Sequence, residues 1–162
     1  MMVSTGVRLR QAGVSDAAAI AACVDAAYRH YIPRLGKPPG PMLLDYATAV
    51  RERDVWVAEV GRVIVGALVL VPAGDYLLLD NIAVHPASQG QGIGRMLLEL
   101  ADREAARQGF TELRLYTHQL MTENIALYTR IGWEETGRSE QDGYERVFFC
   151  KPVPAADPDA SP

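Results

Sequence analysis

The chain has 162 residues, enough for one domain with a substantial hydrophobic core. Its formal net charge is -4, and no block of like charges occurs, which argues against general nucleic-acid binding. Apolar runs fall far short of the roughly 20 residues that cross a membrane, and the first residues lack the basic and apolar segments of a signal peptide. We therefore expect a cytoplasmic protein without a membrane partner or a metal site, in which Cys23 and Cys150 are buried thiols.

The first half of the chain predicts two helices and a hairpin. Alternating residues over 7–11 indicate an edge strand, and Ser15 is placed to cap a helix over 16–29. Residues 28–41 are rich in aromatic and basic side chains and are broken by proline and glycine, which predicts a long functional loop. A second helix is expected over 42–51, followed by two antiparallel strands joined by a tight turn.

The second half begins with a central strand, a glycine-rich turn and a helix, indicated by an apolar run and then by apolar residues at helical spacing. A strand over 110–117 follows, and the helical crossover makes it parallel to the central strand. We expect Thr122 to cap a short helix over 123–131, and an antiparallel pair over 133–137 and 145–151 to complete the domain.

This order of elements fits an α+β domain with a mixed, mainly antiparallel sheet and helices on both faces. We expect residues 1–151 to form this single domain. Residues 152–162, with four prolines and little to bury, predict a disordered tail.

The glycine-rich turn suits a phosphate group. Gly90, Gly92 and Gly94 let the backbone turn tightly and present successive N–H groups at the start of a helix, whose first amides are unpaired. Such a site carries partial positive charge and favours phosphate or pyrophosphate. A dinucleotide fingerprint would need a small residue where Arg95 stands, and the Lys-Ser/Thr pair of a P-loop is absent from the sequence. A tight connection without a ligand is the alternative interpretation.

The segment Gln89-x-x-Gly92-x-Gly94 resembles the acetyl-CoA pyrophosphate signature of the GNAT family of N-acetyltransferases. The strand end over 82–86 and the block over 124–133 resemble two blocks of that family, in the same order and separation. The resemblance implies the GNAT fold, in which a pair of parallel strands splays apart and admits the pantetheine arm of the cofactor.

The resemblance implies acetyl-CoA as the cofactor, held largely by backbone groups. Helix-start amides would bind the pyrophosphate, the strand end would pair with the pantetheine amides, and the N–H of Ile82 or Val84 would polarise the acetyl carbonyl. Where the family commonly has an asparagine this chain has Met121, so that hydrogen bond would come from Asn124 or be missing. The expected cofactor-binding residues are Ile82, Ala83, Val84, Gln89, Gly90, Gln91, Gly92, Ile93, Gly94, Arg95, Asn124 and Tyr128.

Acetyl transfer to an amine needs an acid for the leaving thiolate and a route for the ammonium proton. The resemblance places Tyr128 at the CoA sulfur as the acid, because a phenol stays protonated at neutral pH; a packing tyrosine is the alternative. Asp80, a charge inside an apolar strand, is the first candidate base, with a structural hydrogen-bonding role as its alternative. His118, at the end of the next strand, is the second candidate base.

We therefore expect an N-acetyltransferase that moves an acetyl group from acetyl-CoA to a primary amine of a small molecule or protein, by direct attack in a ternary complex. Tyr28, Tyr31, Asp80 and His118 are expected in the acceptor site. Cations and carboxylates in the expected acceptor loops would suit a zwitterion such as an amino acid. A non-catalytic acyl-CoA-binding regulatory module is the alternative, no nucleic-acid partner is expected, and a homodimer is left open.

Overall fold

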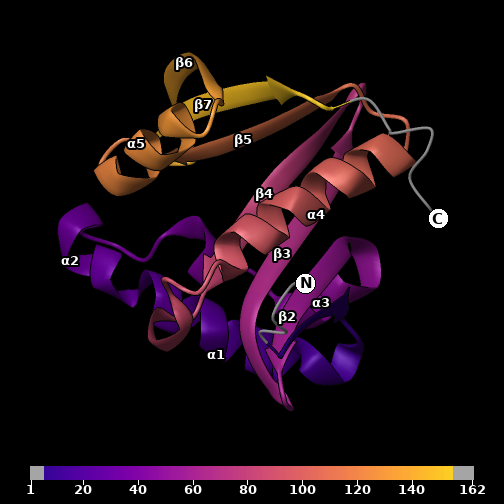
Figure 1. The fold of residues 1–162 in the computed structure, drawn as a ribbon. Coiled ribbons are helices and arrows are strands. Elements are labelled where there is room, and N and C mark those ends of the chain that lie inside the picture. Colours follow the sequence, from indigo (N-terminus) through magenta and orange to yellow (C-terminus); the bar gives the residue numbers. More distant parts are fainter. Residues whose placement is uncertain (1–5, 155–162) are drawn as a thin grey trace. The chain divides into compact units, whose positions relative to one another are not determined.

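The computed structural model describes residues 6–154, whose strands form a seven-stranded sheet in the order β1-β2-β3-β4-β5-β7-β6 (Figure 1). The strands are β1 Val7–Gln11, β2 Asp54–Val60, β3 Val63–Ala73, β4 Tyr76–Val84, β5 Glu112–His118, β6 Glu134–Gln141 and β7 Tyr144–Pro152. The helices are α1 Ala17–Tyr28, α2 Ile32–Leu35, α3 Tyr46–Glu52, α4 Ile93–Arg107 and α5 Thr122–Arg130. Strands β4 and β5 run parallel, whereas β1–β2, β2–β3, β5–β7 and β6–β7 are antiparallel. This mixed, mainly antiparallel sheet confirms the predicted α+β class.

The chain divides into two compact units. Unit 1 holds the chain up to Leu70 together with Asn81–Glu99, and unit 2 holds Val71–Asp80 together with the chain from Leu100 onward. Strands β3 and β4 and helix α4 contribute residues to both units. The single domain over 1–151 stays a prediction.

Unit 1 is built from α1, α3 and the strands β1, β2 and β3, drawn from indigo to magenta in Figure 1. Helix α1 contacts α3, and α3 contacts β2. The buried residues repeat at helical spacing in α1 and continue through both strands of the hairpin, which is how an amphipathic helix and a strand pair form a shared core. These core residues are Ile20, Cys23, Val24, Ala27, Val55, Val57, Ala58, Ala67, Leu68, Val69 and Leu70.

Gly66 on β3 allows the start of α4 to approach the sheet closely. A Cβ atom at this position would lie 3.2 Å from the carbonyl oxygen of Ala83 and also 3.2 Å from side-chain atoms of Ile93 and Leu97. Because a larger residue would push the helix away, glycine here lets the first turns of α4 pack directly on β3 and β4. This packing fixes the N-terminus of α4 beside the end of β4.

Arg10 on β1 bridges two carboxylates within unit 1. Its guanidinium lies 2.8 Å from an oxygen of Asp16 and 2.9 Å from an oxygen of Glu59 on β2. The hydrogen bonds from Arg10 hold the pKa of Asp16 below its usual range. Asp16 also accepts the N–H of Gly13 at 2.8 Å, so Asp16 organises the entry into α1 and the prediction that Ser15 caps the helix is wrong.

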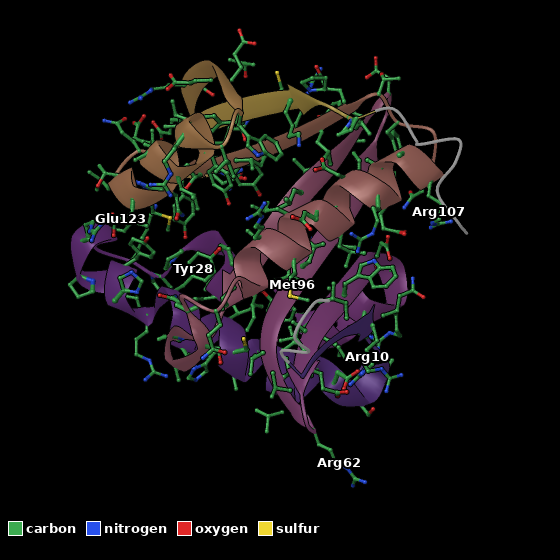
Figure 2. All side chains as sticks on the ribbon, in the orientation of Figure 1. Arg10, Tyr28, Arg62, Met96, Arg107 and Glu123 are labelled. Atoms are coloured by element: carbon green, nitrogen blue, oxygen red, sulfur yellow. The ribbon has the colours of Figure 1, made fainter. Side chains whose placement is uncertain are left out.

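Arg10→Met is expected to lower the free energy of unfolding at neutral pH by about 2 kcal/mol, because it leaves two part-buried carboxylates unpaired. The folded pKa of Asp16 lies below its unfolded value, so this contribution is present above the unfolded pKa and is lost as the pH falls through the folded pKa. Urea unfolding at neutral pH and near pH 3 should show the gap between wild type and variant narrowing at acid pH. Arg62→Met, at the exposed turn after β2 (Figure 2), is the control, and an equal loss there would contradict the assignment.

Unit 2 contains β5, β6, β7 and α5, drawn in orange and yellow in Figure 1, together with the first part of β4. The parallel register pairs Leu77–Leu79 with Leu113–Leu115. Alternate residues on these strands are buried, and they are Leu77, Leu79, Leu113, Leu115, Val147 and Phe149. The residues between them, including Asp80, Tyr116, His118, Tyr144 and Arg146, lie on the opposite face and are partly exposed.

The segment over 28–41 is more regular than the predicted loop. A 3₁₀ turn at Arg29–Tyr31 leads into α2, and a second 3₁₀ turn follows at Gly40–Leu43. Pro33 is tolerated because it stands in the first turn of α2, where its missing N–H costs no hydrogen bond, and Gly36 ends that helix at φ +79°. The predicted loop thus contains short helical turns, and its functional role stays a prediction.

Three other boundaries differ for similar local reasons. Helix α3 begins at Tyr46 rather than at residue 42, because the side chain of Asp45 accepts the first N–H groups of the helix. Thr122 lies inside α5 and its hydroxyl bonds to Glu123, so it does not cap the helix. Strands β6 and β7 are longer than predicted, since Asp142 and the glycine after it both have positive φ and form a two-residue hairpin turn.

The last strand runs one residue past its predicted end at residue 151. Strand β7 reaches Pro152, and the N–H of Val153 donates to the carbonyl of Thr111 at 2.9 Å. Most of the predicted tail over 152–162 lies outside the described residues. In the part of the chain that the structure describes, no helix combines the length and the apolar character needed to cross a membrane.

Candidate active site

A buried polar network surrounds the end of β4 in unit 1. Asn81 is only 4% exposed, and its side-chain N–H donates to the hydroxyl oxygen of Tyr46 at 2.8 Å. The Tyr46 hydroxyl in turn donates to the carbonyl of Pro41 at 2.7 Å. The hydroxyl of Tyr28, labelled in Figure 2, donates to the carbonyl of Ile82 at 2.7 Å and lies 3.2 Å from Oδ1 of Asn81. The network ties α1 and α3 to the last residues of β4.

The main-chain groups of Ile82 and Val84 face away from β3. The N–H of His85 donates to the carbonyl of Val65 on β3 at 2.8 Å, and successive residues of a strand point to opposite edges. The Ile82 carbonyl accepts the tyrosine hydroxyl described above, and the Val84 carbonyl accepts the side-chain N–H of Gln89 at 3.3 Å. The two N–H groups lie along the same edge, where an extended ligand could pair with the strand.

The turn between β4 and α4 presents a row of amides. Gly90 and Gly92 have φ of +83° and +82°, and a Cβ atom at either position would have no heavy atom within 4 Å. The N–H of Met96 donates to the carbonyl of Gly92 at 3.0 Å, which is the start of helical bonding in α4. The amides of residues 93–95 precede that bond and therefore have no acceptor within the helix. A row of unpaired amides at the start of a helix suits an anion such as pyrophosphate.

Gly94 differs from the other two glycines of the motif. Its φ is not in the left-handed region, and a Cβ atom there would meet only a methyl of Val84, at an ordinary 3.7 Å. The sequence reasoning gave all three glycines a part in the tight turn, whereas the backbone requires glycine at only two of them. Arg95 pairs with Glu99 at 3.1 Å on the exposed side of the helix.

Both candidate bases lie in unit 2. Leu79 pairs with Leu115 across the parallel strands, and the next residue, Asp80, accepts the hydroxyl of Tyr116 at 3.0 Å. Nδ1 of His118 accepts the N–H of Leu120 at 3.0 Å, so a neutral His118 carries its proton on Nε2. A hydrogen-bonding role for Asp80 is thus present, and the base role stays a prediction.

Tyr128 is buried in the packing of unit 2. It is 6% exposed, and its ring centroid lies 5.8 Å from that of Trp133 and 5.9 Å from that of Phe149. Asn124, one turn earlier in α5, donates a side-chain N–H to the hydroxyl of Thr117 at 3.3 Å. The ring of Tyr128 thus packs in the core of unit 2, whereas its acid role and the CoA contact of Asn124 stay predictions.

The predicted site residues fall into two groups. Unit 1 contains Tyr28, Tyr31, Ile82, Ala83, Val84 and residues 89–95, and unit 2 contains Asp80, His118, Asn124 and Tyr128.

Sequence reasoning missed Asn81 and Tyr116. Asn81 could have been found by the signal that selected Asp80, a polar residue in an apolar strand, whereas the sequence carries no pairing signal for Tyr116. Tyr31 is buried, with the guanidinium carbon of Arg34 at 5.0 Å from its ring centroid.

Known proteins share both the sequence pattern and the fold. The family model of the acetyltransferase (GNAT) domain matches residues 51–135, slightly more than half of the chain. N-acetyltransferase 8 of Rattus norvegicus is 31% identical over 118 residues, which is 65% of this chain and 53% of that protein. The chain spans about half the length of the curated relatives that it matches first.

Two solved structures show the same fold. The ribosomal-protein-S18-alanine N-acetyltransferase from Escherichia coli matches with a TM-score of 0.72 and 22% identity, over 96% of this chain and 99% of that one. A putative acetyltransferase from Salmonella typhimurium, solved with its cofactor acetyl-CoA, matches with a TM-score of 0.69 and 21% identity, over 97% and 100%. The chain therefore belongs to the GNAT acetyltransferase family, and the resemblance drawn from its sequence is confirmed.

Proposed function

We propose that the protein is an acetyl-CoA-dependent N-acetyltransferase that acetylates a primary amine by direct attack in a ternary complex. The observation that carries the proposal is the turn at Gly90 and Gly92, which leads into unpaired helix amides at the end of β4. Membership of the GNAT family supports the same conclusion. The solved relative from Salmonella typhimurium carries acetyl-CoA, which supports this cofactor.

The residues of unit 1 fit acetyl-CoA. A Cβ atom at Gly90 or Gly92 would meet no heavy atom within 4 Å, which leaves room beside the turn for a pyrophosphate. The unpaired amides of 93–95 would bind it with their partial positive charge. The outward edge of β4 at Ile82 and Val84 offers strand-like hydrogen bonds to the pantetheine amides. The Gln89 side chain must release or share the Val84 carbonyl when the pantetheine pairs there.

Bound acetyl-CoA supplies an activated thioester and a thiolate leaving group. The N–H of Ile82 or Val84 would polarise the acetyl carbonyl and stabilise the oxyanion that forms when the amine attacks. Asp80 would take the ammonium proton, and Tyr128 would donate its phenolic proton to the thiolate. His118 is the alternative to Asp80 as the base.

The proposal is tested by measuring thiol release from acetyl-CoA with a panel of primary amines, together with a titration of acetyl-CoA binding. Amine-dependent thiol release and mass-spectrometric detection of an N-acetylated product are expected. Tight acetyl-CoA binding without thiol release across the panel would instead indicate a non-catalytic binding module. No binding of acetyl-CoA would contradict both interpretations.

Asp80→Asn is expected to lower kcat/KM for the amine about 100-fold, with the acetyl-CoA Kd nearly unchanged, because it removes a proton acceptor while keeping the side-chain shape. The acidic limb of the pH–rate profile should disappear. If that limb survives in Asp80→Asn and disappears in His118→Gln, the base is His118. A lower Tm with unchanged kinetics would mean that the role of Asp80 is structural and includes its hydrogen bond with Tyr116.

Tyr28→Phe is expected to weaken acetyl-CoA binding about fivefold. The change removes the hydroxyl that holds the Ile82 carbonyl, a net hydrogen-bond contribution of about 1 kcal/mol, and so loosens the edge on which the cofactor pairs. Calorimetric titration gives the Kd and a thermal melt gives the Tm. A lower Tm with an unchanged Kd would show that the hydroxyl stabilises the fold alone.

A further inference from the structure

One face of unit 2 carries opposite charges on either side of a tyrosine ring. The Tyr116 hydroxyl donates to Asp80 at 3.0 Å, and the guanidinium carbon of Arg146 lies 4.2 Å from the centroid of the same ring. The register of β5 and β7 pairs His118 with Arg146, which places both on the face that carries Tyr116. Neighbouring strands β4, β5 and β7 thus bring a carboxylate, a phenol and a guanidinium together.

Arg146 is held in position by a tyrosine ring and a neutral amide. The guanidinium carbon of Arg146 lies 5.9 Å from the ring centroid of Tyr144, and Nη1 of Arg146 donates to the neutral side chain of Gln141 at 3.1 Å. Among residues 6–154, no carboxylate forms an ion pair with Arg146. By contrast, the guanidinium of Arg138 on β6 lies 3.0 Å from the carboxylate of Glu135.

A guanidinium is a planar fork of N–H donors that matches a carboxylate in two parallel hydrogen bonds. Stacking on a tyrosine ring orients that fork in advance, so less side-chain entropy is lost when a ligand binds. The opposite charge on the other side of Tyr116, on Asp80, suits the ammonium form of an amine. The two charges are separated by a single tyrosine ring, which suits a small molecule that carries both groups.

We propose that Arg146 binds the carboxylate of the acceptor, and that the acceptor is a small amino acid or amino-acid-like molecule whose amine lies toward Asp80. This inference rests on the proposed acetyltransferase function and adds the class of its acceptor. Arg146 is then a specificity-determining residue, which selects the acceptor without taking part in proton transfer.

The test compares matched acceptors that differ in the carboxylate alone, such as β-alanine and its carboxamide, with the full chain and saturating acetyl-CoA. The wild type should prefer the carboxylate in kcat/KM by about tenfold or more, as expected for hydrogen bonds to a charged group. Arg146→Gln should remove that preference mainly through KM and leave the kcat/KM for the carboxamide nearly unchanged. Arg138→Gln, which removes a guanidinium already paired with Glu135, should keep the preference.

The outcomes separate this inference from the proposed function. Equal kcat/KM for the carboxylate and the carboxamide in the wild type would overturn the acceptor class and leave the acetyltransferase function standing. Acetylation of protein amines alone, with no small-molecule acceptor, would have the same two consequences. Equal losses for both acceptors in Arg146→Gln, with a lower Tm, would assign Arg146 to stacking and overturn its role in specificity. Binding of acetyl-CoA without thiol release from any amine would overturn the proposed function and this inference with it.

Discussion

Gly92→Val is expected to raise the Kd for acetyl-CoA at least about 100-fold, which corresponds to roughly 2.7 kcal/mol. Gly92 has φ +82°, a backbone conformation that a β-branched residue adopts only with strain, so the turn must shift even though a Cβ atom would meet nothing nearby. A shifted turn would move the amides of 93–95 away from the position that binds the pyrophosphate. Calorimetric titration of acetyl-CoA measures the effect.

Gly94→Ala is the matched control for this change. A Cβ atom at Gly94 would make one ordinary contact, at 3.7 Å from Val84, and the residue has no positive φ, so the alanine variant should bind acetyl-CoA with nearly the wild-type Kd. Circular dichroism must show that Gly92→Val remains folded. A folded Gly92→Val protein with an unchanged Kd would show that the cofactor does not use this turn.

The strand, turn and helix at the centre of the chain were predictable because their signals are local. An apolar run, a cluster of glycines and a period of 3.6 residues all lie within one short segment. Helix caps were harder to predict, because several residues at a helix start can act as the cap and tertiary contacts decide among them. Arg10 on β1 holds the carboxylate of Asp16, and that carboxylate also accepts the N–H of Gly13 at the entry to α1. A contact to β1 thus placed Asp16, rather than the predicted cap Ser15, at the start of the helix.

The hydrogen-bond partners of the site were not predictable for a related reason. Tyr28 and Ile82 are 54 residues apart in the chain, and Tyr116 and Asp80 are 36 apart. Such contacts follow from how α1 packs and how β4 and β5 are paired, neither of which hydrophobic periodicity specifies. Sequence reasoning could therefore select Asp80 as chemically unusual, whereas its partner became visible only once β4 and β5 were paired.

Tyr128→Phe is expected to lower kcat about 100-fold, within the range for one general acid, with the acetyl-CoA Kd changed less than about twofold. Only the hydroxyl is removed, so the ring keeps its packing against Trp133 and Phe149 and the Tm should stay close to that of the wild type.

Tyr76→Phe, which removes a hydroxyl from a ring stacked with Arg114, is the control and should keep full activity. Stopped-flow measurement of thiol release separates the chemical step from product release. A fully active Tyr128→Phe protein would mean that water or the acceptor protonates the thiolate and that the Tyr128 hydroxyl is not the acid.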